Sequence, residues 1–379
     1  MRRAAGAASR NLLGNEGASF ALPHKSVAEI AAIAEGAALG SYSFTEFRGS
    51  TKSGQKSPLS SITIVTRFAN TAQAKSAIKR AEIIAEQTFL VRDLVNTPPS
   101  SLTPDSFCLR AKKLASKYGV KVEVLNEAAL RKGGYGGIIG VGQGSVNPPR
   151  LLHLSYSPAK AKKRFAFVGK GITFDTGGLA LKPANGMEAM KADMSGAAAV
   201  VAAIFAIAQL KLPIAIDAWA PLAENMVSDT ATRPSDVITI YGGKSVEVLN
   251  PDAEGRLVLA DALVRAAEVG KKAGGLDGII DVATLTGAQG VALGSRTSAV
   301  MTNNEEFSNQ FLRATEISGE AFWPMPLPEE LRASLDSPIA DLANIGDRMG
   351  GMLVAGLFLK EFIDPQTPMA PFRYCWPCL

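Results

Sequence analysis

Hydrophobic and polar positions along the chain follow two periodicities, one typical of strands and one typical of helices. Short apolar runs that predict strands lie at residues 120–125, 151–156, 165–168, 214–221 and 278–283. Between them, apolar residues recur with helical spacing at 127–132, 195–210 and 257–268. Buried strands that alternate with helices indicate a mostly parallel sheet covered on both faces. We therefore expect an α/β fold whose main domain is a three-layer α/β/α arrangement with a mostly parallel central sheet.

The first part of the chain has the pattern of a smaller α/β domain. Its apolar spacing predicts helices at 27–39 and 72–87 and a strand at 61–68. A proline-rich loop follows, in which Thr103 and Pro104 are typical of a helix N-cap and first helical position. The chain is therefore divided into a partial N-terminal α/β domain with its connecting helix, a main domain and a tail, at residues 1–84, 85–368 and 369–379.

Composition narrows the class of protein. A chain of 379 residues, 47% of them hydrophobic, is long enough to bury a large core. Its net charge of +5 permits an acidic partner but does not demand one. Three cysteines exclude a disulfide scaffold and favour a cytoplasmic protein. The most apolar predicted helix, 196–210, is shorter than the roughly 20 residues that span a bilayer, so we expect no membrane partner.

Two basic segments each have two interpretations. Residues 1–10 lack acidic side chains and imitate an organelle presequence, but an amphipathic helix of the N-terminal domain is the interpretation that we prefer. The cluster Lys160, Lys162, Lys163 and Arg164 precedes a predicted strand. It is interpreted as a solvated loop, with a nucleic-acid contact as the alternative.

Candidate chemistry concentrates in two predicted turns, at 170–178 and 250–256. The second lies between a strand-like run and a helix-like run, and such turns are where open α/β sheets place their chemistry. The glycines around the first turn let the backbone approach a site closely. The two turns, together with the segment that follows the first, supply four carboxylates, two lysines and an arginine: Asp175, Asp193, Asp252, Glu254, Lys170, Lys182 and Arg256.

The rest of the sequence limits what these side chains can do. Only His24 and His153 are present, and neither lies in a ligand-spaced motif, which argues against histidine-based zinc sites and Ser-His-Asp triads. A metal would have to be held by carboxylates, which are costly to cluster unless cations neutralise them. Near two divalent ions the pKa of Lys170 should fall, and its neutral amine can then coordinate.

Each feature also has an ordinary structural explanation. Acidic residues are common at helix starts, where they oppose the helix dipole, and Arg256 can pair with Glu247 or Glu254. Paired glycines are common in turns. The occurrence of both turns in one α/β domain favours a two-metal hydrolase.

The motifs resemble those of the leucyl aminopeptidase (cytosol aminopeptidase) family. The most specific is Asn-Pro-Asp-Ala-Glu-Gly-Arg-Leu at 250–257. Pro251 is a departure, because the family usually has threonine there, but the acidic ligands remain. The resemblance extends over about residues 81–362 and rests on this motif and the segments at 92–99, 168–178, 190–194 and 283–287.

The resemblance implies a role for each candidate ligand. Asp175 and Glu254 would bridge two metal ions. Asp252 would complete one of the metal sites. Lys170 and Asp193 would complete the other site, which would be held more weakly.

The resemblance also implies the catalytic and substrate-binding residues. Lys182 would stabilise the oxyanion that develops on the scissile carbonyl, and Arg256 would hold a bicarbonate ion that acts as general base. The substrate-binding residues would be Met190, Thr284, Leu285 and Gly287.

The family's activity is therefore the expected one. It is a metal-dependent exopeptidase that releases leucine-like N-terminal amino acids from peptides by a metal-bridged hydroxide. The expected cofactors are two divalent ions per subunit, Mn²⁺ or Zn²⁺, with bicarbonate at Arg256. The expected state is a cytoplasmic homohexamer. The alternative is a truncated, weakly active or inactive homologue with a non-hydrolytic DNA-binding or chaperone-like role. Another metallohydrolase, such as a phosphatase, fits the motifs less well.

Both ends differ from the family pattern. The chain is expected to begin inside the family's first domain. At the other end, Cys375 and Cys378 form a Cys-x-x-Cys motif, but the chain stops one residue later, which argues against redox or metal chemistry. Read one base out of frame, codons for 369–379 can encode the family's next block, Trp-x-His-x-Asp-Ile-Ala-Gly. We expect a frameshift near Pro368, which resequencing of that codon would test.

Overall fold

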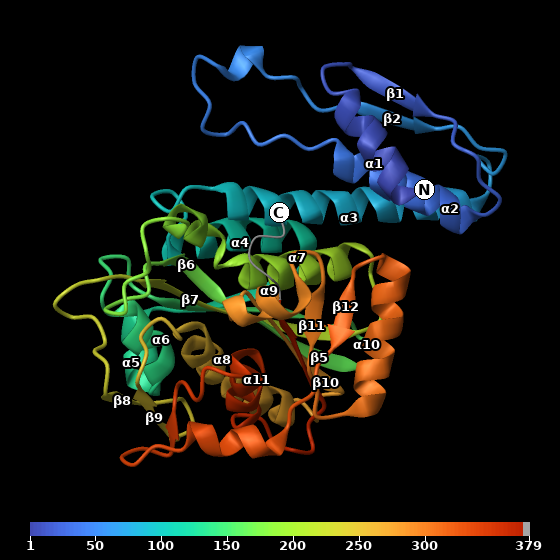
Figure 1. Cartoon of the computed structure of the whole chain (residues 1–379). Coiled ribbons are helices and arrows are strands. Elements are labelled where there is room, and N and C mark those ends of the chain that lie inside the picture. The colour runs from blue at the N-terminus through green and yellow to red at the C-terminus, as the bar shows by residue number, and fades with distance from the viewer. Residues whose placement is uncertain (374–379) are drawn as a thin grey trace. The chain divides into compact units, whose positions relative to one another are not determined.

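The computed structural model describes residues 1–373 (Figure 1), with side chains as far as Met369. Internal contacts divide the chain into two compact units, Met1–Asn96 and a second unit that begins at Thr97. The predicted division between 84 and 85 falls inside α3 (Ala72–Asn96), the long helix that was predicted to begin with residues 72–87.

The first unit packs three helices with a small parallel sheet. Its elements are α1 (Arg2–Asn11), β1 (Gly17–Phe20), α2 (Val27–Gly40), the 3₁₀ turn η1 (Lys52–Gly54), β2 (Ser61–Ile64) and α3. A capping box between Ser26 and Glu29 fixes the start of α2. The predicted amphipathic helix at the N-terminus is confirmed as α1, which buries Ala5 and pairs Arg2 with Glu35 at 2.7 Å.

The second unit is built on a nine-stranded sheet. Its strands are β3 (Lys121–Leu125), β4 (Arg150–Tyr156), β5 (Arg164–Gly169), β6 (Gly171–Asp175), β7 (Ala215–Asn225), β10 (Gly278–Ala283), β11 (Ser298–Val300), β12 (Phe322–Pro324) and β14 (Met369–Arg373). They follow the order β12-β11-β14-β10-β5-β7-β4-β3, with β6 extending the pairing of β7. β5 pairs in parallel with both β7 and β10, whereas β3, β4 and β11 contribute antiparallel pairs. The predicted mostly parallel sheet is confirmed.

Helices cover this sheet on both faces, which confirms the predicted three layers (Figure 1). One face carries α4 (Pro104–Tyr118) and α7 (Ser195–Gln209), which contact β3, β4, β5 and β7. The other carries α6 (Gly136–Gly142) and α8 (Gly255–Lys272), with α11 (Gly351–Lys360) packed on α8. The remaining helical elements are α5 (Glu127–Gly133), η2 (Met187–Ala192), α9 (Gly287–Leu293), α10 (Glu305–Ser318) and η3 (Glu329–Leu335).

The strand that precedes the turn at 250–256 lies outside the main sheet. It is β9 (Ser245–Val248), the middle strand of a three-stranded sheet with β8 (Asp236–Thr239) and β13 (Leu342–Ala343). The turn lies between a strand and a helix, as predicted, but that strand belongs to the smaller sheet. β9 hydrogen-bonds with its neighbour β8 along the chain and with β13, which follows almost 100 residues later.

The first residues of the predicted tail take part in the main sheet. β14 pairs in parallel with β10 and antiparallel with β11. Residues 374–379, with Cys375 and Cys378, lie outside the described residues, so the frameshift and the argument against redox or metal chemistry at these cysteines stay predictions.

α7 packs against the sheet with almost no space between the backbones. A Cβ atom added to Gly169 at the end of β5 would collide with the Gly196 carbonyl oxygen, and one added to Gly196 would collide with the Val282 carbonyl oxygen. η2 and α7 together form an apolar stretch, Met187–Gln209, that is long enough to cross a membrane. Within it, 67% of the most apolar window is buried inside the protein, as in the core helix of a globular domain.

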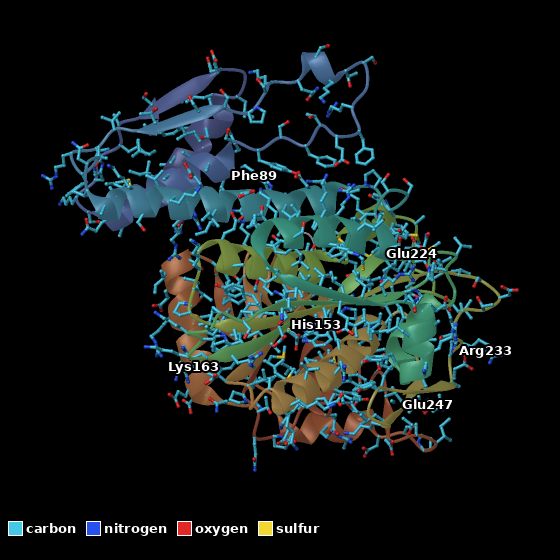
Figure 2. All side chains as sticks on the ribbon, turned by 180° about the vertical axis from the view of Figure 1, so that it is seen from behind. Phe89, His153, Lys163, Glu224, Arg233 and Glu247 are labelled. Atoms are coloured by element: carbon cyan, nitrogen blue, oxygen red, sulfur yellow. The ribbon has the colours of Figure 1, made fainter. Side chains whose placement is uncertain are left out.

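A hydrogen-bond network centred on the buried Asp217 joins β4, β5 and β7 within the sheet. His153 lies in β4, within the sheet (Figure 2). It stacks on Trp219 with ring centroids 3.8 Å apart and lies 2.9 Å from Asp217 through Nε2. Arg164 donates to the other carboxylate oxygen of Asp217 at 2.9 Å. Burial alone would raise the pKa of Asp217, but His153 and Arg164 outweigh burial and hold the pKa below its ordinary value. His153 therefore has a structural role.

We expect Asp217→Asn to lower the free energy of unfolding at pH 7 by about 1–3 kcal/mol, because it removes a buried charged acceptor from two half-buried donors. A carboxylate whose pKa is depressed in the folded state stabilises the fold at pH values above its ordinary pKa of 3.8. This contribution is lost as the pH falls through the pKa of the folded state. The difference between variant and wild type should therefore shrink below about pH 4. Urea unfolding across this pH range measures it.

Asp236→Asn is the matched control, because Asp236 pairs with Arg233 at the surface. The Asp236→Asn substitution should lower the free energy of unfolding by less than about 1 kcal/mol. A deficit for Asp217→Asn that stays constant down to about pH 3 would contradict the assignment.

Candidate metal centre

The candidate site lies where several parallel strands of the main sheet end. Lys170 stands between β5 and β6, Asp175 ends β6, and Asn225 ends β7. Thr284 directly follows β10. Because β5, β6, β7 and β10 run parallel, their carboxyl ends meet at one edge of the sheet.

A tight turn brings the second set of acids to this edge. The Ala253 N–H donates to the Asn250 carbonyl oxygen at 3.0 Å, which closes a β-turn, and the Asp252 N–H donates to the Asn250 side chain at 2.9 Å. Pro251 occupies the second position of the turn, where its fixed φ is favourable. The departure from threonine is therefore compatible with this local structure. α8 then starts at Gly255, with Glu254 as its N-cap residue.

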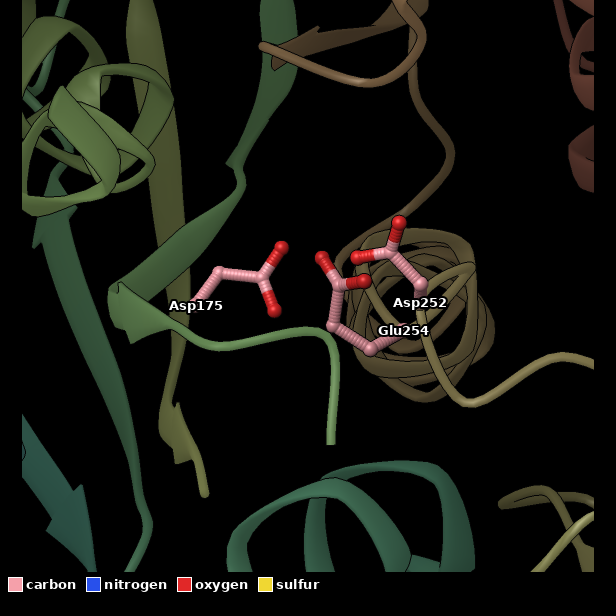
Figure 3. Close-up of side chains that lie close together, drawn as sticks. All are labelled: Asp175, Asp252 and Glu254. Carbon is pink, nitrogen blue, oxygen red and sulfur yellow. The ribbon is translucent and has the colours of Figure 1, made fainter. Parts of the chain in front are cut away.

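Three carboxylates converge at the centre of the site (Figure 3). One oxygen each of Asp175, Asp252 and Glu254 lies within 4.8 Å of the others. Asp175 comes from the end of β6, and the other two come from the chain that enters α8. Asp175 and Glu254 are each only 2% exposed, whereas Asp252 is half-buried.

Two lysines lie among the acids, and each pairs with two of them. The Lys170 ammonium lies 2.7 Å from Asp193 and 2.9 Å from Glu254. The Lys182 ammonium lies 2.8 Å from Asp175 and also contacts Asp252. All six charged groups are therefore connected in one cluster, although they come from four separate segments of the chain.

Thr284 links the end of β10 to this cluster. Its carbonyl oxygen accepts a hydrogen bond from the Lys170 ammonium at 2.9 Å, and its hydroxyl donates to Asp193 at 2.7 Å. The predicted pocket residue is thus in direct contact with two predicted ligands.

The cluster is electrostatically unbalanced in favour of negative charge. Four carboxylates and two lysines leave a formal charge of −2 on these six side chains. Burial raises the pKa of Asp193, of Glu254 and of Asp252, and neighbouring carboxylates add to this rise. For Lys170, burial would lower the pKa, but the charges of Asp193 and Glu254 outweigh burial and raise it. The site therefore favours bound positive charge.

Two glycines shape the loop that follows Asp175. Gly177 and Gly178 have φ values of 85° and 59°, which side chains disfavour. The Gly177 N–H donates to Asp175 at 2.8 Å, and a Cβ atom there would lie 3.0 Å from an Asp252 oxygen. The predicted close approach of backbone to the site is found here.

Two asparagines that the sequence interpretation missed also belong to the site. The Asn225 side chain donates to Asp175 at 2.8 Å and to the Pro251 carbonyl oxygen at 3.2 Å, which joins the two acidic segments. The predicted strand stopped at 221, before this residue. Asn344, directly after β13, hydrogen-bonds to the turn around Asp252. No spacing in the sequence connects Asn344 to that turn.

The remaining predicted residues lie around the cluster. Arg256 is buried in the first turn of α8 and donates to the Asn344 carbonyl oxygen at 2.7 Å. Met190 is half-buried in η2, three residues before Asp193. Leu285 packs against the main core, and Gly287 is exposed at the start of α9.

Comparison with known proteins identifies relatives along most of the chain. The model of the cytosol aminopeptidase family, catalytic domain, matches residues 89–375. The probable cytosol aminopeptidase of Streptomyces avermitilis is 54% identical over 365 residues, which cover 96% of this chain and 70% of that protein. The corresponding protein of Nocardia farcinica is 53% identical over 379 residues, which cover 100% of this chain and 73% of that protein.

A solved structure has the same fold. The bottromycin maturation enzyme BotP in complex with Mn superposes with a TM-score of 0.89 and 40% sequence identity, over 98% of this chain and 79% of that one. The predicted family resemblance and α/β fold are confirmed. The chain belongs to the cytosol aminopeptidase family and is an aminopeptidase of the hydrolase class.

Proposed function

We propose that this chain is a metal-dependent exopeptidase that removes leucine-like N-terminal residues from peptides. The observation that carries the proposal is the convergence of Asp175, Asp252 and Glu254 within 4.8 Å. Family membership supports exopeptidase activity. The solved Mn complex of the BotP enzyme supports a divalent ion.

The residues at the site fit two divalent ions. Carboxylate oxygens suit Mn²⁺ and are also known ligands of Zn²⁺. The formal charge of −2 on a largely buried cluster is costly unless further cations neutralise it. The raised pKa values of Asp193 and Glu254 reflect this cost. Mn²⁺ or Zn²⁺ would supply the missing positive charge.

The positions of the acids support a division of ligands. Asp175 and Glu254, the most buried of the converging carboxylates, would contact both ions. Asp252 would complete one site, and Lys170 with Asp193 would complete the other. The carboxylates around Lys170 favour its ammonium form. Coordination by its amine therefore requires that the charge of an ion replace the charge of the proton.

Bound divalent ions supply a water of lowered pKa and polarise the peptide carbonyl. The chain's own residues would stabilise the charge that then develops. Burial would lower the pKa of Lys182, but Asp175 and Glu254 outweigh it and raise the pKa, so Lys182 stays cationic at neutral pH. It is thus suited to stabilise the oxyanion and unsuited to act as a base. Arg256 would hold a bicarbonate ion as general base.

Substrate recognition would use the charge and the walls of the site. The free α-amine of a peptide would bind to a divalent ion held at the site, which favours exopeptidase over endopeptidase activity. Met190, Thr284, Leu285 and Gly287 would form the pocket for the N-terminal side chain. An apolar pocket discriminates by only about 1–3 kcal/mol per methylene, so leucine preference should be modest.

We expect the protein with added Mn²⁺ to hydrolyse leucine p-nitroanilide, and a chelator to abolish this activity until Mn²⁺ is restored. Asp252→Ala should lower kcat/KM by at least about 100-fold, because it removes a ligand. The Asp236→Asn variant, which changes a carboxylate outside the cluster, is the control and should keep the wild-type rate. Hydrolysis that withstands both the chelator and Asp252→Ala would contradict the metal assignment.

We expect Lys170→Met to lower the free energy of unfolding of chelator-treated protein by about 3–5 kcal/mol, because it leaves two buried carboxylates without their cation. Lys182→Met should lower the free energy of unfolding by less, since the Lys182 side chain is 19% exposed and that of Lys170 only 4%. Urea unfolding of the three proteins measures the order. Equal stability of all three would show that the lysines do not balance the acids.

We propose that the subunits assemble as a cytoplasmic homohexamer. Light scattering coupled to size exclusion should give about six times the monomer mass of 39.7 kDa. A monomer or dimer at micromolar concentration would refute this assembly. Fractionation of the source cells tests the compartment.

A further inference from the structure

Asn344 is a buried polar residue whose hydrogen bonds almost all reach one short segment, that of Asp252 and Glu254. It follows β13 and is 0% exposed. Its backbone N–H donates to the Glu247 carbonyl oxygen at 2.9 Å, and its carbonyl oxygen accepts from Arg256 at 2.7 Å. These two contacts lie on either side of the turn that carries the acids.

The side-chain amide of Asn344 holds the turn itself. Its oxygen accepts from the N–H groups of Leu249 at 2.8 Å and Asn250 at 3.1 Å. Its nitrogen donates to the carbonyl oxygens of Asn250 at 2.7 Å and Ala253 at 3.4 Å. An amide suits this place because it accepts on one side and donates on the other. An aspartate of the same shape would set a carboxylate against two carbonyl oxygens.

We propose that Asn344 is a positioning residue that sets the metal affinity of the site through the Asp252–Glu254 turn, without contacting the ions. This inference rests on the proposed function. Among the described residues, the ion pairs of its acids with Lys170 and Lys182 and the Asn225 contact with the Pro251 carbonyl oxygen connect the turn to the rest of the site. Asn344 supplies a further anchor, from a segment 94 residues away.

The backbone of Asn344 also contacts Arg256. Its guanidinium donates to the Asn344 backbone, and the ring centroid of Phe358 lies 5.8 Å from its central carbon. Loss of the Asn344 side chain therefore affects the acids of the turn first, since the bond to Arg256 comes from the backbone carbonyl and survives substitution.

The chain offers a matched control in Asn303. Its side chain also clamps two backbone groups, donating to the Thr367 carbonyl oxygen at 3.0 Å and accepting from the Met369 N–H at 2.8 Å. These contacts join the loop that precedes α10 to the start of β14, and they involve none of the candidate ligands. Asn303 is half-buried, so Asn303→Ala reports the general cost of losing an amide clamp away from the site.

The test is Mn²⁺ binding by isothermal titration to full-length, chelator-treated Asn344→Asp, Asn344→Ala, Asn303→Ala and wild-type protein, with urea unfolding of each. We expect both Asn344 variants to bind Mn²⁺ about 10- to 100-fold more weakly than wild type, the usual effect of removing a residue that orients ligands. Asn303→Ala should lose stability but keep its Mn²⁺ affinity within about twofold.

Two results would overturn the inference in distinguishable ways. Wild-type affinity in both Asn344 variants, while wild type binds Mn²⁺, would refute the positioning role and leave the proposed function standing. Wild-type protein that binds no Mn²⁺ would refute the proposed function, and the inference with it. If Asn344→Ala does not fold, the isosteric Asn344→Asp decides.

Discussion

The balance between clustered carboxylates and the cations among them is the constraint on which this structure depends. Four acids meet at one edge of the main sheet, where burial raises the pKa values of three of them. Each lysine pairs with acids from separate segments, so the ion pairs also join β6, η2 and the start of α8. The ion pairs that offset the cost of burying these charges therefore also fix the relative positions of the ligands.

Much of the main sheet could be predicted from local pattern. The strand at 278–283 was placed with its observed ends, and those at 151–156 and 165–168 within one residue of them, because a buried strand is a continuous apolar run. The pattern predicted a turn where β6 lies, since this strand is short and stands between the polar residue Lys170 and its own last residue, Asp175. The ligand set could be named because its side chains lie in two short, chemically specific motifs.

What the sequence could not reveal depends on contacts between distant segments. β9 follows the pattern of a main-sheet strand, but its place in a separate sheet is decided by pairing with β8 and β13. Asn225 and Asn344 act through hydrogen bonds that span 26 to 95 residues. A single asparagine carries no periodic signal, so its role is visible only when its partners are seen.

The close packing of α7 on the sheet has a consequence for how this protein can vary. The Ala197 N–H donates to the Lys170 carbonyl oxygen at 2.8 Å, so the helix backbone directly supports the lysine of the site. That approach requires hydrogen atoms in place of side chains at Gly169 and Gly196. Every amino-acid replacement reachable from a glycine codon by one base change introduces a Cβ atom. These two codons therefore have no missense neighbour that preserves the close approach of helix and sheet.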